Sequence, residues 1–180
     1  VRSSSGPLSS RQFHTAFLDT VSGRNRMLVF GGLDALGAAI SDNSIWAWDL
    51  TTETWSQPAV TGGPPSARGG HTLVYGTTQI DRDAGPDTIL AHRAVLFGGK
   101  NGSTYYNDTW ELWIDDDVNG ALSWQQVTPA GGPPAGRAFH TAIHERGWER
   151  LVITGGETAS NTVTDETWGL ADFNKLTLGG

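Results

Sequence analysis

The chain has 180 residues, a net charge of −7 at pH 7, 24 glycines, eight tryptophans and no cysteine. The absence of cysteine excludes disulfides, thiol nucleophiles and cysteine-ligated zinc, and an acidic chain without a basic block argues against nucleic acid as a partner. No apolar run is long enough to cross a membrane, so we expect no membrane insertion. Because glycine and tryptophan are abundant and helix formers are sparse, we expect short strands and many turns. These features do not indicate in which cellular compartment the protein acts.

The first group of predicted elements spans about residues 7–57. An Arg-x-x-His-Thr segment opens it, the apolar run MLVF ends on two glycines, and two tryptophans follow after polar loops. Short β-branched or aromatic runs bounded by turn residues are typical of strands. The landmarks of this first copy are Arg11, His14, Gly31, Gly32, Trp46 and Trp55.

A second copy spans about residues 64–127. Its additional polar residues, Thr77–His92, are expected to form an extended hairpin loop between the first two strands. Insertions in repeat proteins fall on loops, and such loops commonly carry function. We therefore expect partner contacts at Asp81, Arg82, Asp83 and Asp87. The landmarks of the second copy are Arg68, His71, Gly98, Gly99, Trp110 and Trp124.

A third copy spans about residues 133–180. No tryptophan marks its last strand, and we expect NKLTLGG, residues 174–180, to supply that strand. If each copy is one blade of a β-propeller, three copies predict an open arc, because propellers typically have four to eight blades. Such an arc is either a piece of a longer propeller or associates with another copy. The landmarks of the third copy are Arg137, His140, Gly155, Gly156 and Trp168.

Four predicted strands recur in three copies, and a four-stranded repeat of this kind predicts a propeller blade. The predicted fold is all-β, a β-propeller segment of three four-stranded antiparallel blades. The Gly-Gly after an apolar strand, the tryptophan that follows it and the last-strand tryptophan resemble the kelch repeat. This resemblance implies a propeller, usually of six or seven blades. It implies no single activity, since most relatives are binding scaffolds and a few are enzymes.

The repeated residues have structural explanations. We expect the glycine pairs to adopt conformations or permit close approaches that other residues do not, and the tryptophans to pack between blades. One histidine per copy suggests a metal site, but packed sheets lie roughly 10 Å apart, whereas zinc ligands lie at about 2.0–2.1 Å. We therefore expect the arginine and histidine side chains to satisfy buried backbone groups and one another.

The segment DDDVNG, residues 115–120, stands outside the repeat and matches the first half of a calcium-binding loop. Asp115, Asp117 and Asn119 would offer side-chain oxygens to calcium, and Gly120 would allow the sharp turn. The expected glutamate at the twelfth position of the loop is replaced by Gln126. The alternative is a solvated acidic hairpin whose Asn-Gly supplies the turn.

The sequence indicates a binding scaffold that engages a protein, or a glycan, through loops between strands. Further propeller blades, from the parent chain or another copy, are expected as additional partners. No catalytic residue is identified: galactose-oxidase-like relatives use a Cys-linked tyrosine, which a chain without cysteine does not build. Two alternatives stay open. One is the propeller portion of an enzyme whose active site lies outside this chain, and the other is a calcium-stabilised extracellular adhesion module.

Overall fold

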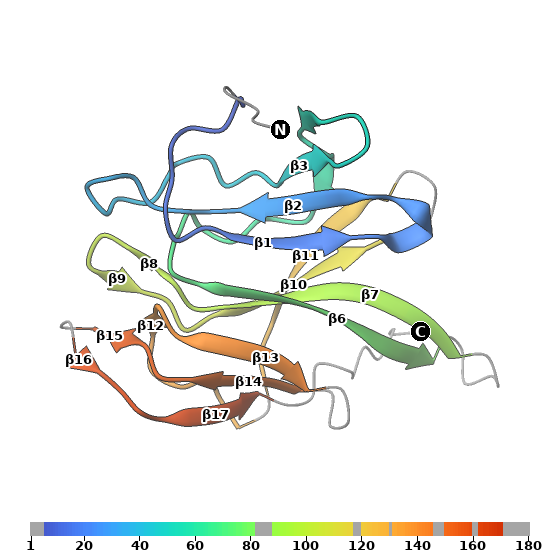
Figure 1. Ribbon diagram of the computed structural model, residues 1–180. Coiled ribbons are helices and arrows are strands. Elements are labelled where there is room, and N and C mark those ends of the chain that lie inside the picture. Colours follow the sequence, from blue (N-terminus) through green and yellow to red (C-terminus); the bar gives the residue numbers. More distant parts are fainter. Residues whose placement is uncertain are drawn as a thin grey trace.

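The computed structural model describes residues 6–81, 88–116, 120–129, 131–145, 150–159 and 162–170. Three antiparallel sheets stack one after another, with the N-terminal sheet at one end of the stack and the C-terminal sheet at the other (Figure 1). The prediction of an all-β propeller segment is confirmed. In the part of the chain that the structure describes, no helix is long and apolar enough to span a membrane.

The first sheet has the strand order β1-β2-β3-β4, which is also the chain order. A short 3-10 helix, η1 (Val21–Gly23), joins its first two strands. Each strand pairs antiparallel with the next, as in a meander. The strands are β1 (Thr15–Asp19), β2 (Arg26–Phe30), β3 (Trp46–Asp49) and β4 (Thr54–Ser56).

The second and third sheets repeat this arrangement. In the second sheet, β5 (Val60–Thr61) adds a parallel edge strand beside β11; its other strands are β6 (Thr72–Asp81), β7 (Thr88–Phe97), β10 (Thr109–Ile114) and β11 (Leu122–Val127). The described strands of the third sheet are β13 (Thr141–Glu145), β14 (Arg150–Thr154) and β17 (Thr167–Leu170). The expected last strand at residues 174–180 lies outside the described residues.

Two small sheets follow the glycine pairs of the second and third copies and lie at the same side of the stack (Figure 1). The sequence patterns did not predict them, because their strands are only two residues long. They consist of β8 (Lys100–Asn101) with β9 (Thr104–Tyr105), and of β12 (Arg137–Ala138) with β15 (Glu157–Thr158) and β16 (Thr162–Val163).

The additional residues of the second copy differ from the expected loop. Most of them extend β6 and β7, and the pairing continues from Thr77↔His92 outward to Asp81↔Thr88. Threonine and isoleucine are frequent in these segments, and β-branched residues favour strands. The polar character of the segment indicated a loop, but a polar sequence is also compatible with two strands whose backbones pair with each other.

The apolar core lies between the sheets, and each face of the second sheet contributes to it. In β7, Ala94 and Leu96 pack with residues of the first sheet such as Phe30. The intervening Val95 and Phe97 pack with residues of the third sheet, including Leu151. This burial on both faces explains why the strand is a continuous apolar run rather than an alternating one.

Consecutive sheets are joined at the glycine pairs. The N–H of Gly32 donates to the carbonyl oxygen of Arg68 at 2.9 Å, and the N–H of Gly99 donates to the carbonyl oxygen of Arg137 at 2.8 Å. A Cβ atom on Gly98 would lie 2.5 Å from the Arg137 carbonyl oxygen, and φ of Gly98 is +64°. The pair is therefore required both by the backbone conformation and by the approach of the next sheet.

We expect Gly98→Ala to lower the free energy of unfolding by about 2–4 kcal/mol, because it adds left-handed strain and a collision with backbone. Gly102→Ala is the matched control, since Gly102 also has positive φ (+57°) but nothing within 4 Å of the added Cβ. The control should lose only about 1 kcal/mol. Urea unfolding of the two variants measures the difference, and equal losses would show that the approach to Arg137 is unimportant.

Candidate partner-binding face

The residue before each repeated histidine has a left-handed backbone: φ is 56° at Phe13, 67° at Gly70 and 60° at Phe139. The N–H of Gly70 donates to the Phe13 carbonyl oxygen at 2.9 Å, and the N–H of Phe139 donates to the Gly70 carbonyl oxygen at 2.7 Å. These bonds join three consecutive copies of the repeat by backbone alone. The positive φ values therefore belong to a continuous link across the sheets.

Phe13 and Phe139 form an exposed aromatic pair above Gly70. Their ring centroids lie 4.8 Å apart in an edge-on arrangement, and the two side chains are 50% and 40% exposed. A Cβ atom on Gly70 would lie 2.7 Å from the Phe139 ring, so glycine leaves room for the two rings to meet. A bulky residue with positive φ costs on the order of 1–3 kcal/mol, and such strain gathers at functional sites.

A charged group adjoins the aromatic pair. The Lys100 ammonium lies 5.7 Å from the centroid of the Phe139 ring and donates a hydrogen bond to Tyr105 Oη at 2.8 Å. Glu157 accepts a hydrogen bond from Tyr105 and lies 3.4 Å from the ammonium. The hydrogen bond to Tyr105 raises the pKa of Lys100. The face thus combines exposed aromatic surface with a cation held in place by two side chains.

The repeated histidines lie behind this face as a ladder between copies. His71 Nε2 shares a hydrogen bond with Thr15 Oγ1 at 2.7 Å, and His140 Nε2 shares one with Thr72 Oγ1 at 3.0 Å. Burial, with the charge of Arg68 beside it, lowers the pKa of His71 to about 3. Burial likewise lowers the pKa of His140 to about 4. Both rings are neutral at pH 7, and the exposed His14 has no preceding copy among the described residues.

The repeated arginines satisfy backbone oxygens at the glycine pairs of their own sheets. Arg11 donates to the Gly31 carbonyl oxygen at 3.0 Å, Arg68 to that of Gly98 at 2.9 Å, and Arg137 to that of Gly155 at 3.2 Å. Arg68 and Arg137 are fully buried. Gly156, like Gly32 and Gly99, has positive φ.

The acids that pair with these buried guanidinium groups were not predicted from the sequence. Asp108 lies 2.5 Å from Arg68, and Glu166 lies 2.7 Å from Arg137. Burial alone would raise the pKa of Asp108, but the hydrogen bond and charge of Arg68 outweigh it, and the pKa is lowered. The sequence does contain a pattern that could have identified them: an acid lies two residues before Trp110 and before Trp168, and each indole N–H donates to that acid.

The repeated tryptophans occupy different environments. Trp124 lies in the apolar core between the first and second sheets, whereas Trp55 contacts Trp48 in a tilted arrangement with ring centroids 5.2 Å apart. Trp46 donates its indole N–H to Asp42 at 2.6 Å. Trp168 is partly exposed on the third sheet. The tryptophans on the third strand of each sheet therefore also act as hydrogen-bond donors, which their apolar character did not indicate.

The residues expected to contact a partner on the long hairpin are only partly described. Asp81 is the last residue of β6, where its backbone pairs with Thr88. Arg82, Asp83 and Asp87 lie outside the described residues. The outer end of this hairpin lies at the side of the stack opposite to β8, β9, β15 and β16 (Figure 1). Of the expected contact residues, the structure therefore places only Asp81.

The expected calcium loop adjoins two arginines of the first sheet. Arg24 donates to the Asp115 carbonyl oxygen at 2.9 Å, and Arg26 donates to the Gly120 carbonyl oxygen at 3.1 Å. Both guanidinium groups also bond the buried Asp19. Asp117 and Asn119 lie outside the described residues. Among the residues that are described, no group of three acids or histidines is placed to hold a metal ion.

Stacked four-stranded meanders whose first strands adjoin one another define a segment of a β-propeller. A family model described as "KLHDC2/KLHL20/DRC7 Kelch-repeats domain" matches residues 1–177. The chain therefore belongs to the kelch-repeat family.

Among characterised proteins, the chain is similar to "Rab9 effector protein with kelch motifs" of Xenopus laevis, with 32% identity over 57% of this chain and 23% of that protein. It is also similar to human "Kelch domain-containing protein 1", with 26% identity over 81% of this chain and 36% of that protein. The chain thus spans about a quarter to a third of the length of these relatives. A solved structure described as "Structure of YjhT" matches 89% of this chain and 81% of that one, with 14% identity and a TM-score of 0.30.

The neutral, buried histidines make stability depend on pH. Their folded pKa values of about 3 and about 4 lie below the unfolded value of about 6.5, so their contribution is fully present above pH 6.5 and is lost as the pH falls toward the folded values. For each histidine, we expect the free energy of unfolding to fall by about 1.4 kcal/mol per pH unit as the pH is lowered from about 6 to 4.5.

His71→Asn removes one titrating group while keeping a polar side chain, and should flatten this pH dependence by the share of one histidine. Urea unfolding at several pH values measures the slope for both proteins. Parallel curves for the variant and the wild type would contradict the assignment of a neutral His71.

The calcium loop stays a prediction. It requires that calcium at millimolar concentration gives heat in a calorimetric titration and raises the melting temperature, and that Asp115→Ala removes both effects. No heat and no shift in melting temperature would reject the calcium site and leave the arginine-bound hairpin as the explanation of this acidic segment.

Proposed function

We propose that this kelch propeller segment is a protein-binding scaffold whose partner docks on the aromatic pair of Phe13 and Phe139. The observation that carries the proposal is that two large aromatic side chains are exposed on left-handed backbone and contact each other across three copies of the repeat. Aromatic residues are enriched among the side chains that dominate binding energies in protein interfaces.

The neighbouring groups define the chemistry of the partner. An apolar side chain fits against the two rings, beside which the Lys100 ammonium is paired with Glu157. The name of one relative, "Rab9 effector protein with kelch motifs", describes a protein that acts with a protein partner. That name supports a protein partner for the present chain, and it does not identify which one.

The extended β6–β7 hairpin is a second candidate surface. The paired backbone of β6 and β7 extends away from the small sheets as far as Asp81 and Thr88. The charged residues of the sequence between these two strands, Asp81, Arg82, Asp83 and Asp87, would suit a partner with charged groups.

We expect the double variant Phe13→Ser with Phe139→Ser to lose most of the proteins that the wild-type chain captures from a lysate, quantified by mass spectrometry. Each removed ring takes a contact of about 1–3 kcal/mol from the interface. Leu50→Ser is the control, because Leu50 is 44% exposed and follows β3 at the end of the first sheet opposite to Phe13, where Asp49 pairs with Arg26 and Arg26 with Asp19. Circular dichroism and melting temperature confirm that the variants are folded.

Deletion of residues 78–89 separates the two surfaces. The deletion removes the outer part of a protruding hairpin and should leave the fold and the capture through the aromatic pair intact. If the deletion abolishes capture while the double phenylalanine variant retains it, the hairpin is the binding surface and the aromatic pair is not.

The outer faces of the first and third sheets provide a proposed contact for further propeller blades. Leu18 on β1 is 50% exposed and Ile143 on β13 is 61% exposed, and both side chains lie in strands whose other face is packed in the core. We expect the 19.2 kDa chain to associate with increasing concentration in light scattering, and Leu18→Lys with Ile143→Lys to reduce that association. A wild-type monomer at all concentrations would contradict this proposal.

A further inference from the structure

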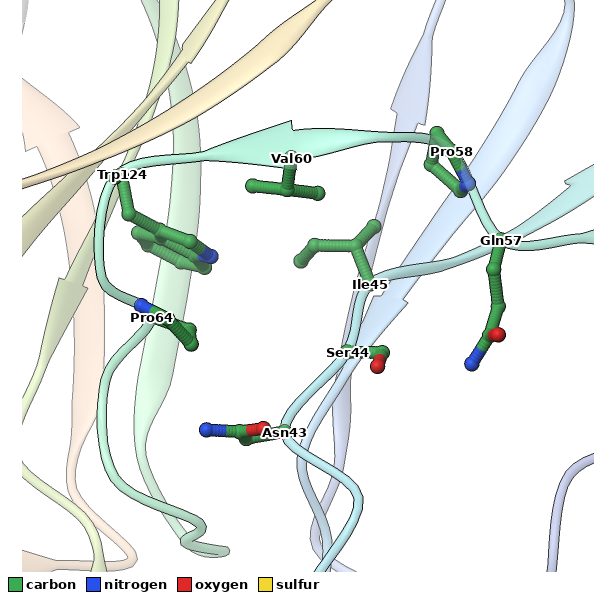
Figure 2. A pocket seen from close by; sticks show the side chains of 9 residues that line it. Asn43, Ser44, Ile45, Gln57, Pro58, Val60, Pro64 and Trp124 are labelled. Atoms are coloured by element: carbon green, nitrogen blue, oxygen red, sulfur yellow. The ribbon is translucent and has the colours of Figure 1, made fainter.

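A pocket of about 260 Å³ lies where the first and second sheets meet. One wall is formed by Asn43, Ser44 and Ile45, which lead into β3, and the opposite wall by Trp124 of β11. The chain that crosses from the first copy to the second closes the pocket with Val60 and Pro64 (Figure 2). The pocket is distinct from the aromatic pair, since the two share no residue.

The indole of Trp124 carries an unsatisfied hydrogen-bond donor in this pocket. Trp124 is 4% exposed, and its Nε1 atom is buried without a hydrogen-bond partner. Figure 2 shows the indole nitrogen directed into the space between Val60, Ile45 and Pro64. Buried indole N–H groups usually have an acceptor, because an unsatisfied buried donor is costly.

Two aromatic rings pack against the indole of Trp124 and hold it in position. The Trp124 ring lies 5.2 Å from the Phe30 ring and 6.5 Å from the Trp110 ring, measured between centroids. The crossing chain is equally fixed: Val60 pairs with Leu122, and Gly62 passes so close to the Trp124 carbonyl oxygen that a Cβ atom has no room there. Packing therefore holds the indole and the wall formed by the crossing chain in place before any ligand binds. Because Nε1 itself is buried, an acceptor reaches it after a small shift of the lining side chains.

The lining specifies a neutral ligand. The pocket lining combines apolar side chains with the amides of Asn43 and Gln57 and the hydroxyl of Ser44, and none of the lining residues is charged. An ion would lose its hydration without a compensating charge. A group that fits must fill a small apolar space and place one acceptor oxygen against the indole N–H.

We propose that this pocket binds an aliphatic side chain of an extended peptide segment, together with a backbone carbonyl oxygen that accepts from Trp124 Nε1. A peptide presents both groups within a few bonds of each other. The polar groups among the lining residues match the remaining peptide N–H and C=O groups. A water molecule is a poorer match, because it would leave the apolar part of the pocket unfilled, whereas a peptide residue fills that space and also supplies the acceptor oxygen.

The test follows the indole N–H signal of Trp124 in nitrogen-15 NMR spectra of the labelled protein. Trp124→Phe identifies the signal among those of the eight tryptophans. The probe is N-acetyl-leucine N-methylamide, which carries one aliphatic side chain between two amide carbonyls. A ligand of this size is expected to bind with a dissociation constant of about 1 mM, so titration to about 10 mM should saturate the shift.

Two controls separate specific binding from a general solvent effect. N-acetylglycine N-methylamide has the same carbonyls without the side chain and should shift the signal at least about tenfold less at equal concentration, because it leaves the apolar space unfilled. Val60→Phe fills the pocket from the crossing chain and should abolish the shift. Val163→Phe is the matched control, because Val163 is exposed and outside the pocket, and it should leave the shift unchanged.

Three results would overturn the proposal. The Trp124 signal does not move at about 10 mM probe; or the glycine compound moves it as much as the leucine compound; or Val60→Phe leaves the shift intact. A persistent contact between the indole proton and a bound water in the presence of the leucine compound would assign the pocket to water instead. None of these results depends on the aromatic pair, so the proposed docking face stands or fails separately.

Discussion

The contact between the glycine pair of one sheet and the arginine of the next is the interaction on which the stack depends. The second glycine donates its N–H to the arginine carbonyl oxygen, and the first glycine has no room for a Cβ atom at that point. The guanidinium group of the same arginine turns back to the glycine carbonyl oxygen of its own sheet. One arginine thus connects two sheets. The distance that it sets between consecutive sheets also allows the histidine–threonine hydrogen bonds and the Phe13–Gly70–Phe139 backbone link to form.

A buried guanidinium group needs an anion, and this requirement extends the contact outward. Arg68 is held by both carboxylate oxygens of Asp108, which also accepts from the indole of Trp110. Loss of one partner of a buried ion pair typically costs about 3–5 kcal/mol, because it leaves the other charge unpaired. Glu166 is about half exposed, so its pair with Arg137 is screened by solvent and contributes less.

The features that suggest binding arise where copies of the repeat meet. The aromatic pair joins residues of the first and third copies across a glycine of the second, and the Trp124 pocket lies between the first copy and the crossing chain to the second. Both features lie at junctions between copies: the rings of Phe13 and Phe139 come from different copies and contact each other, and the indole donor of Trp124 has no hydrogen-bond partner.

The sequence by itself determined the three copies, the strand content and the propeller class, because strand periodicity and the Gly-Gly, Trp and Arg-x-x-His-Thr patterns are local and recur three times. It also pointed to the segment Thr77–His92 as an insertion, but the tertiary structure decided that most of it is paired strand. The aromatic pair, the acids that hold Arg68 and Arg137, and the unsatisfied indole of Trp124 were decided only by the packing of one copy against the next. These contacts join residues far apart in the chain, and no local pattern specifies the distance or the direction from which a neighbouring sheet approaches.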